Sequence, residues 1–177
     1  MKKSSWIILC IVLLIANLYF GLEFRKLRNN PFSGKIVVEK SEKKISLPFE
    51  NSILTLIIYF SYRNCEECMR ESYWWNKLFK DLSREEISIV GIVPGNEEIE
   101  GLRNRYKILF PMYYDKNLNI AKKFLISITP FRIIMNKKGR IFYMAPADRE
   151  IKSQERFYFV VIELLRKAKQ EEAQKYW

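Results

Sequence analysis

Residues 54–71 read LTLIIYFSYRNCEECMRE, and this stretch decides the fold. Its first half, Leu54 to Phe60, has the length and the β-branched and aromatic content of a buried strand. The apolar residues that follow, from Met69 to Leu82, recur at helical spacing. We therefore expect Cys65 and Cys68 to stand at a strand-to-helix turn, with Cys65 at or near the helix start.

This placement favours reactive thiols, because the positive end of a helix stabilises the thiolate form of cysteine. We expect Cys65, nearer the helix end, to be the nucleophile and Cys68 to be the thiol that resolves the mixed disulfide. A zinc site would need two further ligands, but the third cysteine, Cys10, lies in an apolar N-terminal run and the chain has no histidine. A haem c attachment site would need histidine where Met69 stands. We expect no metal and no cofactor beyond the redox-active Cys65–Cys68 disulfide.

Composition limits the remaining classes. The 177 residues, 49% of them hydrophobic, suffice for one domain and a tail. The absence of histidine excludes Ser-His-Asp and Cys-His catalysis. The net charge of +11 would suit an anionic membrane surface or simply a solvated basic surface. We expect no nucleic-acid partner, because the basic residues are spread along the chain and no nucleic-acid-binding motif accompanies them.

The N-terminal segment is expected to anchor the protein in a membrane. Lys2 and Lys3 precede the uncharged, mostly apolar run from Trp6 to Leu22, which lies at the short end of the length that crosses a bilayer. A cleaved signal peptide is the competing interpretation, but no small-residue cleavage site follows the run. We therefore expect a cytoplasmic N-terminus over residues 1–5, an uncleaved signal-anchor helix over 6–22 and a linker over 23–34.

Strand and helix patterns alternate through the rest of the chain, which predicts an α/β fold with a mixed sheet over residues 35–170 and a charged tail over 171–177. The last helix is expected to bury Phe157, Phe159, Val160, Val161, Leu164 and Leu165. The other expected elements are a hairpin of 35–39 with 44–47, a strand at 87–93 stopped by Pro94-Gly95, a helix capped by Asn96 and ending near Lys107, a strand at 110–114, a helix at 118–124 capped by residues 115–117, a hairpin of 131–135 with 140–144, and that last helix from about Ser153.

This order of elements resembles the thioredoxin fold with an N-terminal β-hairpin and an inserted βα unit. Over about residues 34–167 it is similar to the membrane-anchored thiol-disulfide oxidoreductases of the TlpA/ResA group in the redoxin superfamily. The segment from Cys65 to Glu71 matches that group's Cys-x-x-Cys-x-x-Glu, and Thr129-Pro130 precedes an apolar strand as the group's Thr-Pro does. Two positions depart from the group: Asn64 replaces a tryptophan, and Tyr59 replaces a buried aspartate or asparagine.

The resemblance implies roles for further residues. Glu71 would be the acid/base that manages the proton of the buried thiol. Thr129 and Pro130 would form a cis-proline turn that pairs with an extended substrate segment. Tyr62, Trp74 and Trp75 either line the cleft or fill the core.

The resemblance also implies partners and a location. The partners would be protein thiols and disulfides, apocytochrome c among them, and a membrane electron donor, as in cytochrome c biogenesis. The catalytic domain would lie on the extracytoplasmic (periplasmic) side of the inner membrane, held by one span. Disulfides form outside the cytoplasm, which supports that orientation.

Two glutamates tune the expected chemistry. Glu66 and Glu67 place negative charge beside the thiols, and like charge disfavours the thiolate. We therefore expect a reductant of partner disulfides, although a helix-start preference alone also explains both glutamates.

Two other functions stay open. A peroxiredoxin-like peroxidase is disfavoured because Tyr62 stands where that group's motif has a threonine or serine. A non-catalytic thioredoxin-like assembly or copper-delivery protein is disfavoured because the copper-binding relatives use Cys-x-x-x-Cys and a distant histidine, and this chain has neither.

Overall fold

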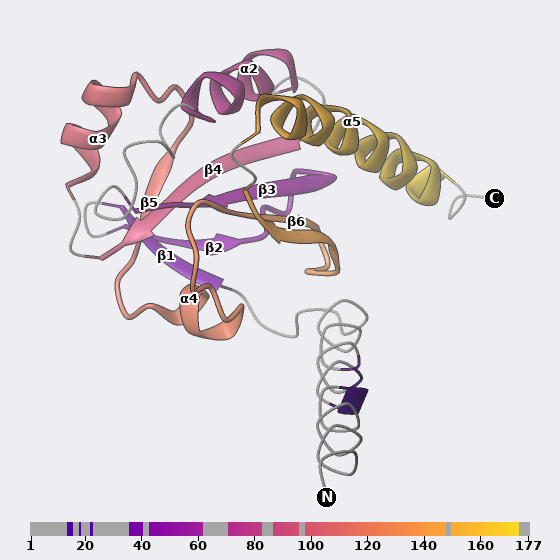
Figure 1. The fold of residues 1–177 in the computed structure, drawn as a ribbon, viewed down its shortest axis with the longest axis horizontal. Helices are drawn as coiled ribbons and strands as arrows, with labels where there is room; N and C mark the ends of the chain where they lie inside the picture. The colour runs from indigo at the N-terminus through magenta and orange to yellow at the C-terminus, as the bar shows by residue number, and fades with distance from the viewer. Residues whose placement is uncertain are drawn as a thin grey trace, which may run out of the picture.

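The computed structural model describes Leu14, Ile15, Leu18 and Leu22 and the ranges 36–40, 43–61, 71–82, 87–95, 98–147 and 150–173. Within these ranges one seven-stranded sheet runs in the order β2-β1-β5-β4-β3-β6-β7, with helices on both faces (Figure 1). The strands are β1 (Ile36–Lys40), β2 (Lys43–Leu47), β3 (Leu54–Tyr59), β4 (Ile87–Pro94), β5 (Met112–Asp115), β6 (Phe131–Asn136) and β7 (Ile141–Pro146), and the helices are α2 (Ser72–Leu82), α3 (Ile99–Tyr106), α4 (Asn119–Lys123) and α5 (Ile151–Ala173).

Strand β3 is the axis of the sheet. It pairs in parallel with β4 and antiparallel with β6, and all six of its residues are buried. Leu56 and Ile58 face the core under α2, α3 and α5, whereas Ile57 and Tyr59 face the core that holds α4. Figure 1 shows α2 and α5 on one side of the sheet and α4 on the other. The apolar run at 54–60 therefore forms a strand buried on both faces, as its composition predicts.

Both expected hairpins are present, because β1 pairs antiparallel with β2 and β6 pairs antiparallel with β7. The inserted β5–α4 unit is also present, with β5 parallel to β4. The Asp115 carboxylate accepts hydrogen bonds from the backbone N–H groups of Ile120 (3.1 Å to Oδ2) and Ala121 (3.1 Å), so the first residue of the predicted cap at 115–117 satisfies N–H groups in the first turn of α4. The predicted mixed α/β architecture is confirmed.

Two details of the prediction are wrong. Helix α3 takes Glu98, not Asn96, as its N-cap residue, because the Glu98 backbone is still extended (φ −82°, ψ 104°). Phe159 is 60% exposed, since it lies two residues beyond the buried Phe157 and hence about 200° further round the helix.

The expected charged tail is partly helical, because α5 continues to Ala173. Ala168 is buried against the main core, and Glu172 forms an ion pair of 2.6 Å with Lys137 in the β6–β7 turn. These contacts extend the last helix past residue 171, where the tail was expected to begin.

The expected anchor at 6–22 lies almost wholly outside the described residues. Leu14, Ile15, Leu18 and Leu22 are helical and between 61% and 62% exposed. Within the described part of the chain, no helix has the length and apolar content that crossing a membrane requires.

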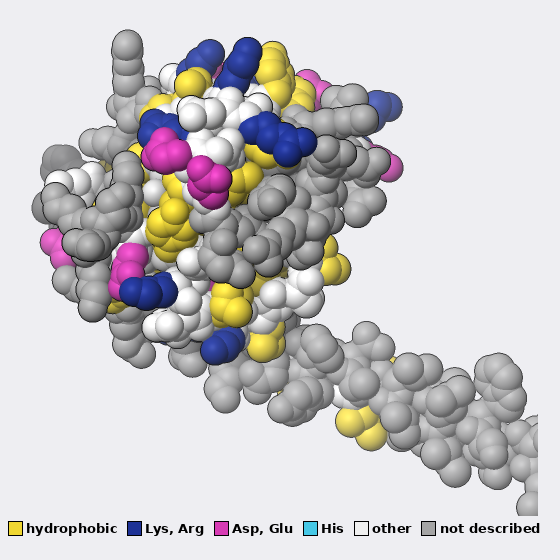
Figure 2. Space-filling view, turned by 90° about the vertical axis from the view of Figure 1, so that its left-hand side faces the viewer, with side chains coloured by type: hydrophobic (Ala, Val, Ile, Leu, Met, Phe, Trp, Pro, Cys, Tyr) yellow, Lys and Arg dark blue, Asp and Glu magenta, His cyan; other side chains and the backbone are white. Residues whose placement is uncertain are grey.

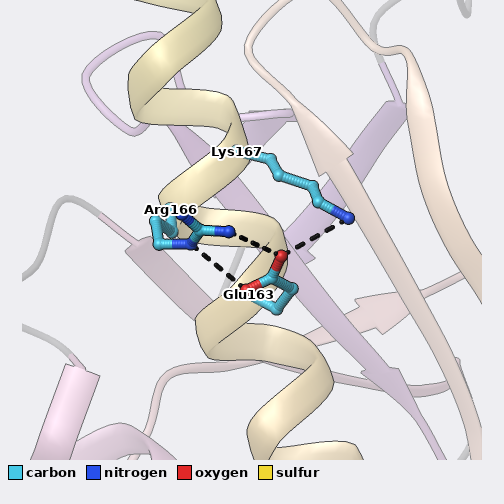
Figure 3. A network of polar contacts seen from close by, with 3 residues as sticks. All are labelled: Glu163, Arg166 and Lys167. Carbon is cyan, nitrogen blue, oxygen red and sulfur yellow. Dashed lines mark hydrogen bonds and ion pairs between the residues drawn. The ribbon is translucent and has the colours of Figure 1, made fainter.

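Figure 2 shows lysine and arginine side chains on one face of the molecule, some of them beside aspartate or glutamate side chains. On α5, Arg166 donates from Nη2 (2.9 Å) and Nε (3.2 Å) to the two carboxylate oxygens of Glu163, and Lys167 lies 3.5 Å from the same group (Figure 3). The hydrogen bonds from Arg166 hold the pKa of Glu163 below its ordinary value. Such exposed pairs along a helix contribute little to stability.

Substitution of Gly91 tests how tightly the core under α2, α3 and α5 is packed. A Cβ added there would lie 3.0 Å from ring carbons of Phe60 and Phe110 and 3.3 Å from Met112. We expect Gly91→Ala to lower the free energy of unfolding by about 1–3 kcal/mol, measured by urea denaturation.

Gly101→Ala is the matched control. Gly101 is exposed in α3, and its added Cβ would meet only the flexible Glu98 side chain. Alanine is the better helix former, so this variant should be more stable than the parent by up to about 1 kcal/mol. Equal effects at both glycines would contradict the packing described for β4.

Candidate active site

The carboxyl end of β3 and the start of β6 lie side by side, because the two strands are antiparallel. Tyr59 is in register with Phe131, so the turn at Thr129–Pro130 lies where the chain leaves β3 toward Cys65. The Thr129–Pro130 peptide bond is cis, as the resemblance implies. The Pro130 carbonyl accepts a hydrogen bond from the Ala147 N–H (2.7 Å), which fixes the turn against the end of β7.

The Cys-x-x-Cys itself lies outside the described residues, which stop at Ser61 and resume at Glu71. The expected positions of Cys65, Glu66, Glu67 and Cys68 therefore stay predictions. Both described ends of this segment are buried, with Ser61 6% and Glu71 3% exposed. The described residues on either side of the segment are thus buried in the domain.

Glu71 is held by groups from three elements. Arg132 of β6 donates from Nη2 to Glu71 Oε2 at 2.8 Å, and Trp75 of α2 donates from Nε1 to the same oxygen at 3.2 Å. The Gln154 side chain of α5 also hydrogen-bonds the carboxyl group. Glu71 is therefore a buried carboxyl with donors on several sides and a surface role for it is excluded.

Arg132 is the positive member of this cluster. It is 2% exposed, and its guanidinium carbon lies 4.2 Å from the centroid of the Phe157 ring. Among the described residues its Nε atom has no hydrogen-bond partner. The ion pair with Glu71 is thus the main polar interaction of a wholly buried guanidinium, to which the aromatic face of Phe157 adds a cation–π contact.

Two opposing influences act on Glu71. Burial raises the pKa of its carboxyl above the ordinary value, while the Arg132 charge and the hydrogen bonds from Arg132, Trp75 and Gln154 lower it. Burial has the larger effect, so the net pKa is raised. A carboxyl with a raised pKa is suited to proton exchange with a neighbouring group.

Sequence reasoning found Glu71 but missed Arg132 and Gln154. A signal for Arg132 was available: it is a lone charge in the apolar strand Phe131–Met135, and a charge in a buried strand needs a buried partner. Nothing comparable marks Gln154, whose role depends on where α5 crosses the sheet.

Two aromatic side chains considered from the sequence take different places. Trp75 is 1% exposed and fills the core while it binds Glu71. Trp74 is half-buried and stacks edge-on against the exposed Tyr73, with ring centroids 5.7 Å apart. Tyr62 lies outside the described residues.

Tyr59, which stands where the TlpA/ResA group has a buried aspartate or asparagine, lies on the face of the sheet that carries α4. Tyr59 is 3% exposed and packs in the α4-side core, whereas Glu71 and Arg132 lie under α2 and α5. Tyr59 therefore does not take part in the Glu71 cluster. Within the described ranges no group of three or more acidic or cysteine side chains could hold a metal ion.

Comparison with protein families gives a match to the AhpC/TSA family over residues 32–144, which is more than half of the chain. The chain belongs to this family. The AhpC/TSA match spans the sheet from β1 to most of β7 and includes both cysteines and the Thr129–Pro130 turn.

A curated relative is the thiol-disulfide oxidoreductase ResA of Halalkalibacterium halodurans. It is 29% identical over 79 residues, which cover 44% of this chain and 45% of ResA, so the match spans less than half of either protein. The match supports the resemblance to the TlpA/ResA group drawn from the sequence.

Solved structures share the fold. StoA from Bacillus subtilis aligns with a TM-score of 0.56 at 19% identity, over 71% of this chain and 98% of StoA. A putative thiol:disulfide interchange protein DsbE from Chlorobium tepidum aligns with a TM-score of 0.64 at 9% identity, over 75% of this chain and 94% of the other. The thioredoxin domain of a thiol-disulfide oxidoreductase from Bacteroides vulgatus aligns with a TM-score of 0.57 at 16% identity, over 71% and 94%. The predicted thioredoxin fold is confirmed.

The buried ion pair predicts a pattern of stabilities. Arg132→Met leaves Glu71 buried without its partner and should lower the free energy of unfolding by about 3–5 kcal/mol in urea denaturation. Replacing both groups, as in Glu71→Leu with Arg132→Met, should recover most of this loss, because neither charge is then left unpaired.

Arg140→Met is the matched control in the same hairpin. Arg140 is 53% exposed, so its loss should change the free energy of unfolding by no more than about 0.5 kcal/mol. Equal losses from Arg132→Met and from the double variant would contradict the account of the pair.

Proposed function

We propose that this protein is a thiol-disulfide oxidoreductase that acts through Cys65 and Cys68. The observation that carries the proposal is that both ends of the Cys-containing segment are tied to the strand after cis-Pro130. Tyr59 pairs with Phe131, and Glu71 pairs with Arg132. A reactive cysteine pair next to a turn whose backbone can receive an extended peptide suits exchange with a protein disulfide.

The reaction we propose has two exchange steps. The Cys65 thiolate attacks one sulfur of a partner disulfide, and the other partner sulfur leaves as a thiolate that takes up a proton. The Cys68 thiolate then attacks the Cys65 sulfur, which forms the Cys65–Cys68 disulfide and releases the second partner thiol. Two electrons pass to the partner in one cycle, and a dithiol donor in the membrane restores the reduced pair by the same exchange in reverse.

Glu71 is the group to which we assign the proton of the second thiol. It follows Cys68 by three residues, and its buried carboxyl has a raised pKa. Such a carboxyl can accept the Cys68 proton as that thiol becomes a nucleophile and return it when the pair is reduced. Thr129 and Pro130 would hold the substrate segment, while Glu66 and Glu67 would bias the pair toward the reduced thiols and thus toward a reductant.

The proposed setting is the outer side of the cytoplasmic membrane. The run at 6–22 would anchor the domain by a single span, and the substrates would be protein disulfides, with apocytochrome c as one candidate. The need for a reductant where disulfides form supports this setting.

The test is exchange activity of the full chain. Reduced protein should accelerate the reduction of insulin disulfides, and Cys65→Ser should return the rate to that of the buffer. Cys68→Ser should accumulate a mixed disulfide through Cys65, visible by mass spectrometry, because the resolving thiol is missing.

Cys10→Ser is the control, since Cys10 lies far from the pair in sequence and should be dispensable. An unchanged rate in Cys65→Ser would refute the assignment. Peroxide consumption without disulfide exchange would instead favour the peroxidase alternative.

A further inference from the structure

Arg132 is unusual because it is a charged residue that is buried in a strand. It stands two residues after Pro130 in β6, in register with Ile58 of β3, and is only 2% exposed. A buried guanidinium cannot lose its proton, so it must be matched by a negative charge. The partner that supplies that charge is Glu71, which belongs to the segment that carries the cysteines.

The geometry fixes both members of the pair. Phe157 of α5 covers the guanidinium at 4.2 Å, and Gln154 of the same helix hydrogen-bonds the Glu71 carboxyl. Trp75 donates to the carboxyl from α2. The start of α2 is therefore joined to β6 and α5 through one carboxyl and one guanidinium.

Glu71 is close to Cys68 along the chain. Three peptide units separate Cys68 from Glu71, so their Cα atoms can be no more than about 11 Å apart. That limit is close to the screening length at physiological salt, and buried charges are screened less than exposed ones. We therefore expect the charge state of the pair to influence the Cys68 thiol.

We propose that Arg132 is a positioning residue of the redox pair: it holds the Glu71 carboxyl against β6 and balances its charge whenever that carboxyl is ionised. This inference rests on the proposed function and assigns to it a residue outside the Cys-x-x-Cys and the cis-proline turn. Removal of Glu71 alone leaves a bare buried cation, and removal of Arg132 alone leaves a carboxyl that must take up a proton.

The other groups around Glu71 do not supply this charge. Trp75 on α2 and Gln154 and Phe157 on α5 are neutral, and in the described part of the chain Arg132 is the only charged group that acts on the carboxyl. The sequence neighbours outside that part, which include Glu66, Glu67 and Arg70, stay the same in every variant below. Differences between variants in the Glu71 pKa and in thiol reactivity therefore report on the Glu71–Arg132 pair.

The first readout is the titration of Glu71 itself. Carbon-13 NMR of the full chain, labelled at glutamate carboxyls and assigned with Glu71→Gln, gives the pKa of Glu71 directly. Arg132→Met should raise this pKa by about one unit or more, because the stabilising charge is lost. Arg132→Lys keeps the charge and should restore most of the wild-type value, and the exposed Arg140→Met should leave it unchanged.

The second readout is the reactivity of the thiols, measured as the rate of iodoacetamide alkylation against pH in a Cys10→Ser background. Glu71→Gln leaves the guanidinium unpaired, which favours the thiolate and should raise the rate near about pH 6 roughly tenfold. In Glu71→Gln with Arg132→Met the charge is absent, so the rate should return close to that of wild type. A merely structural brace would not produce this reversal.

Two results would overturn the inference: a Glu71 pKa that is the same in wild type and Arg132→Met, or an alkylation profile that Glu71→Gln shifts equally with and without Arg132. If Arg132→Met does not fold, the test rests on Arg132→Lys and on the double variant Glu71→Gln with Arg132→Met. Neither of these leaves an unpaired buried carboxylate. The NMR titration needs no redox activity. A wild-type protein that fails to reduce insulin would therefore refute the proposed function and still leave the charge pairing to be judged.

Discussion

The structure depends on one buried ion pair, in which Glu71 and Arg132 share a hydrogen bond of 2.8 Å at 3% and 2% exposure. Neither group could be buried alone without a cost of several kcal/mol, so the helix after the cysteines, the strand after cis-Pro130 and α5 must all be in place together. Hydrophobic burial holds the sheet and helices together, but apolar contacts alone would tolerate small shifts between them. The ion pair does not tolerate such shifts, and it therefore fixes the position of Glu71, which follows the Cys-x-x-Cys in the chain.

The central strand provides the rigid base for that arrangement. β3 is buried on both faces between β4 and β6, and its register with β6 sets Tyr59 opposite Phe131. The end of β3 and the cis-proline turn are consequently neighbours before any side chain is considered. The ion pair holds Glu71 in the same way, so the described residues on both sides of the Cys-containing segment are fixed in position, as a catalytic site requires.

Short sequence patterns predicted the elements that depend on local interactions. The buried strand at 54–60, both hairpins and the Asp115 cap follow from short patterns of apolar, turn and capping residues, and the structure confirms them. The partner of Glu71 could not be predicted in this way, because Arg132 is 61 residues away and no periodicity links the two. Phe159 was placed wrongly because the buried stripe of α5 runs through Phe157, Val161 and Leu165, and only the packed helix shows which side that is.

The buried Glu71 carboxyl of raised pKa, its matched buried cation and the similarity to thiol-disulfide oxidoreductases support one proposal: that Cys65 and Cys68 form a reducing couple. The most direct test is the reduction potential of that couple in the full chain, equilibrated against dithiothreitol and glutathione buffers and read by thiol labelling. A potential at or below about −250 mV, near that of thioredoxin, is the predicted result. A potential above about −180 mV, in the range of oxidases and isomerases, or failure to form the Cys65–Cys68 disulfide, would contradict it.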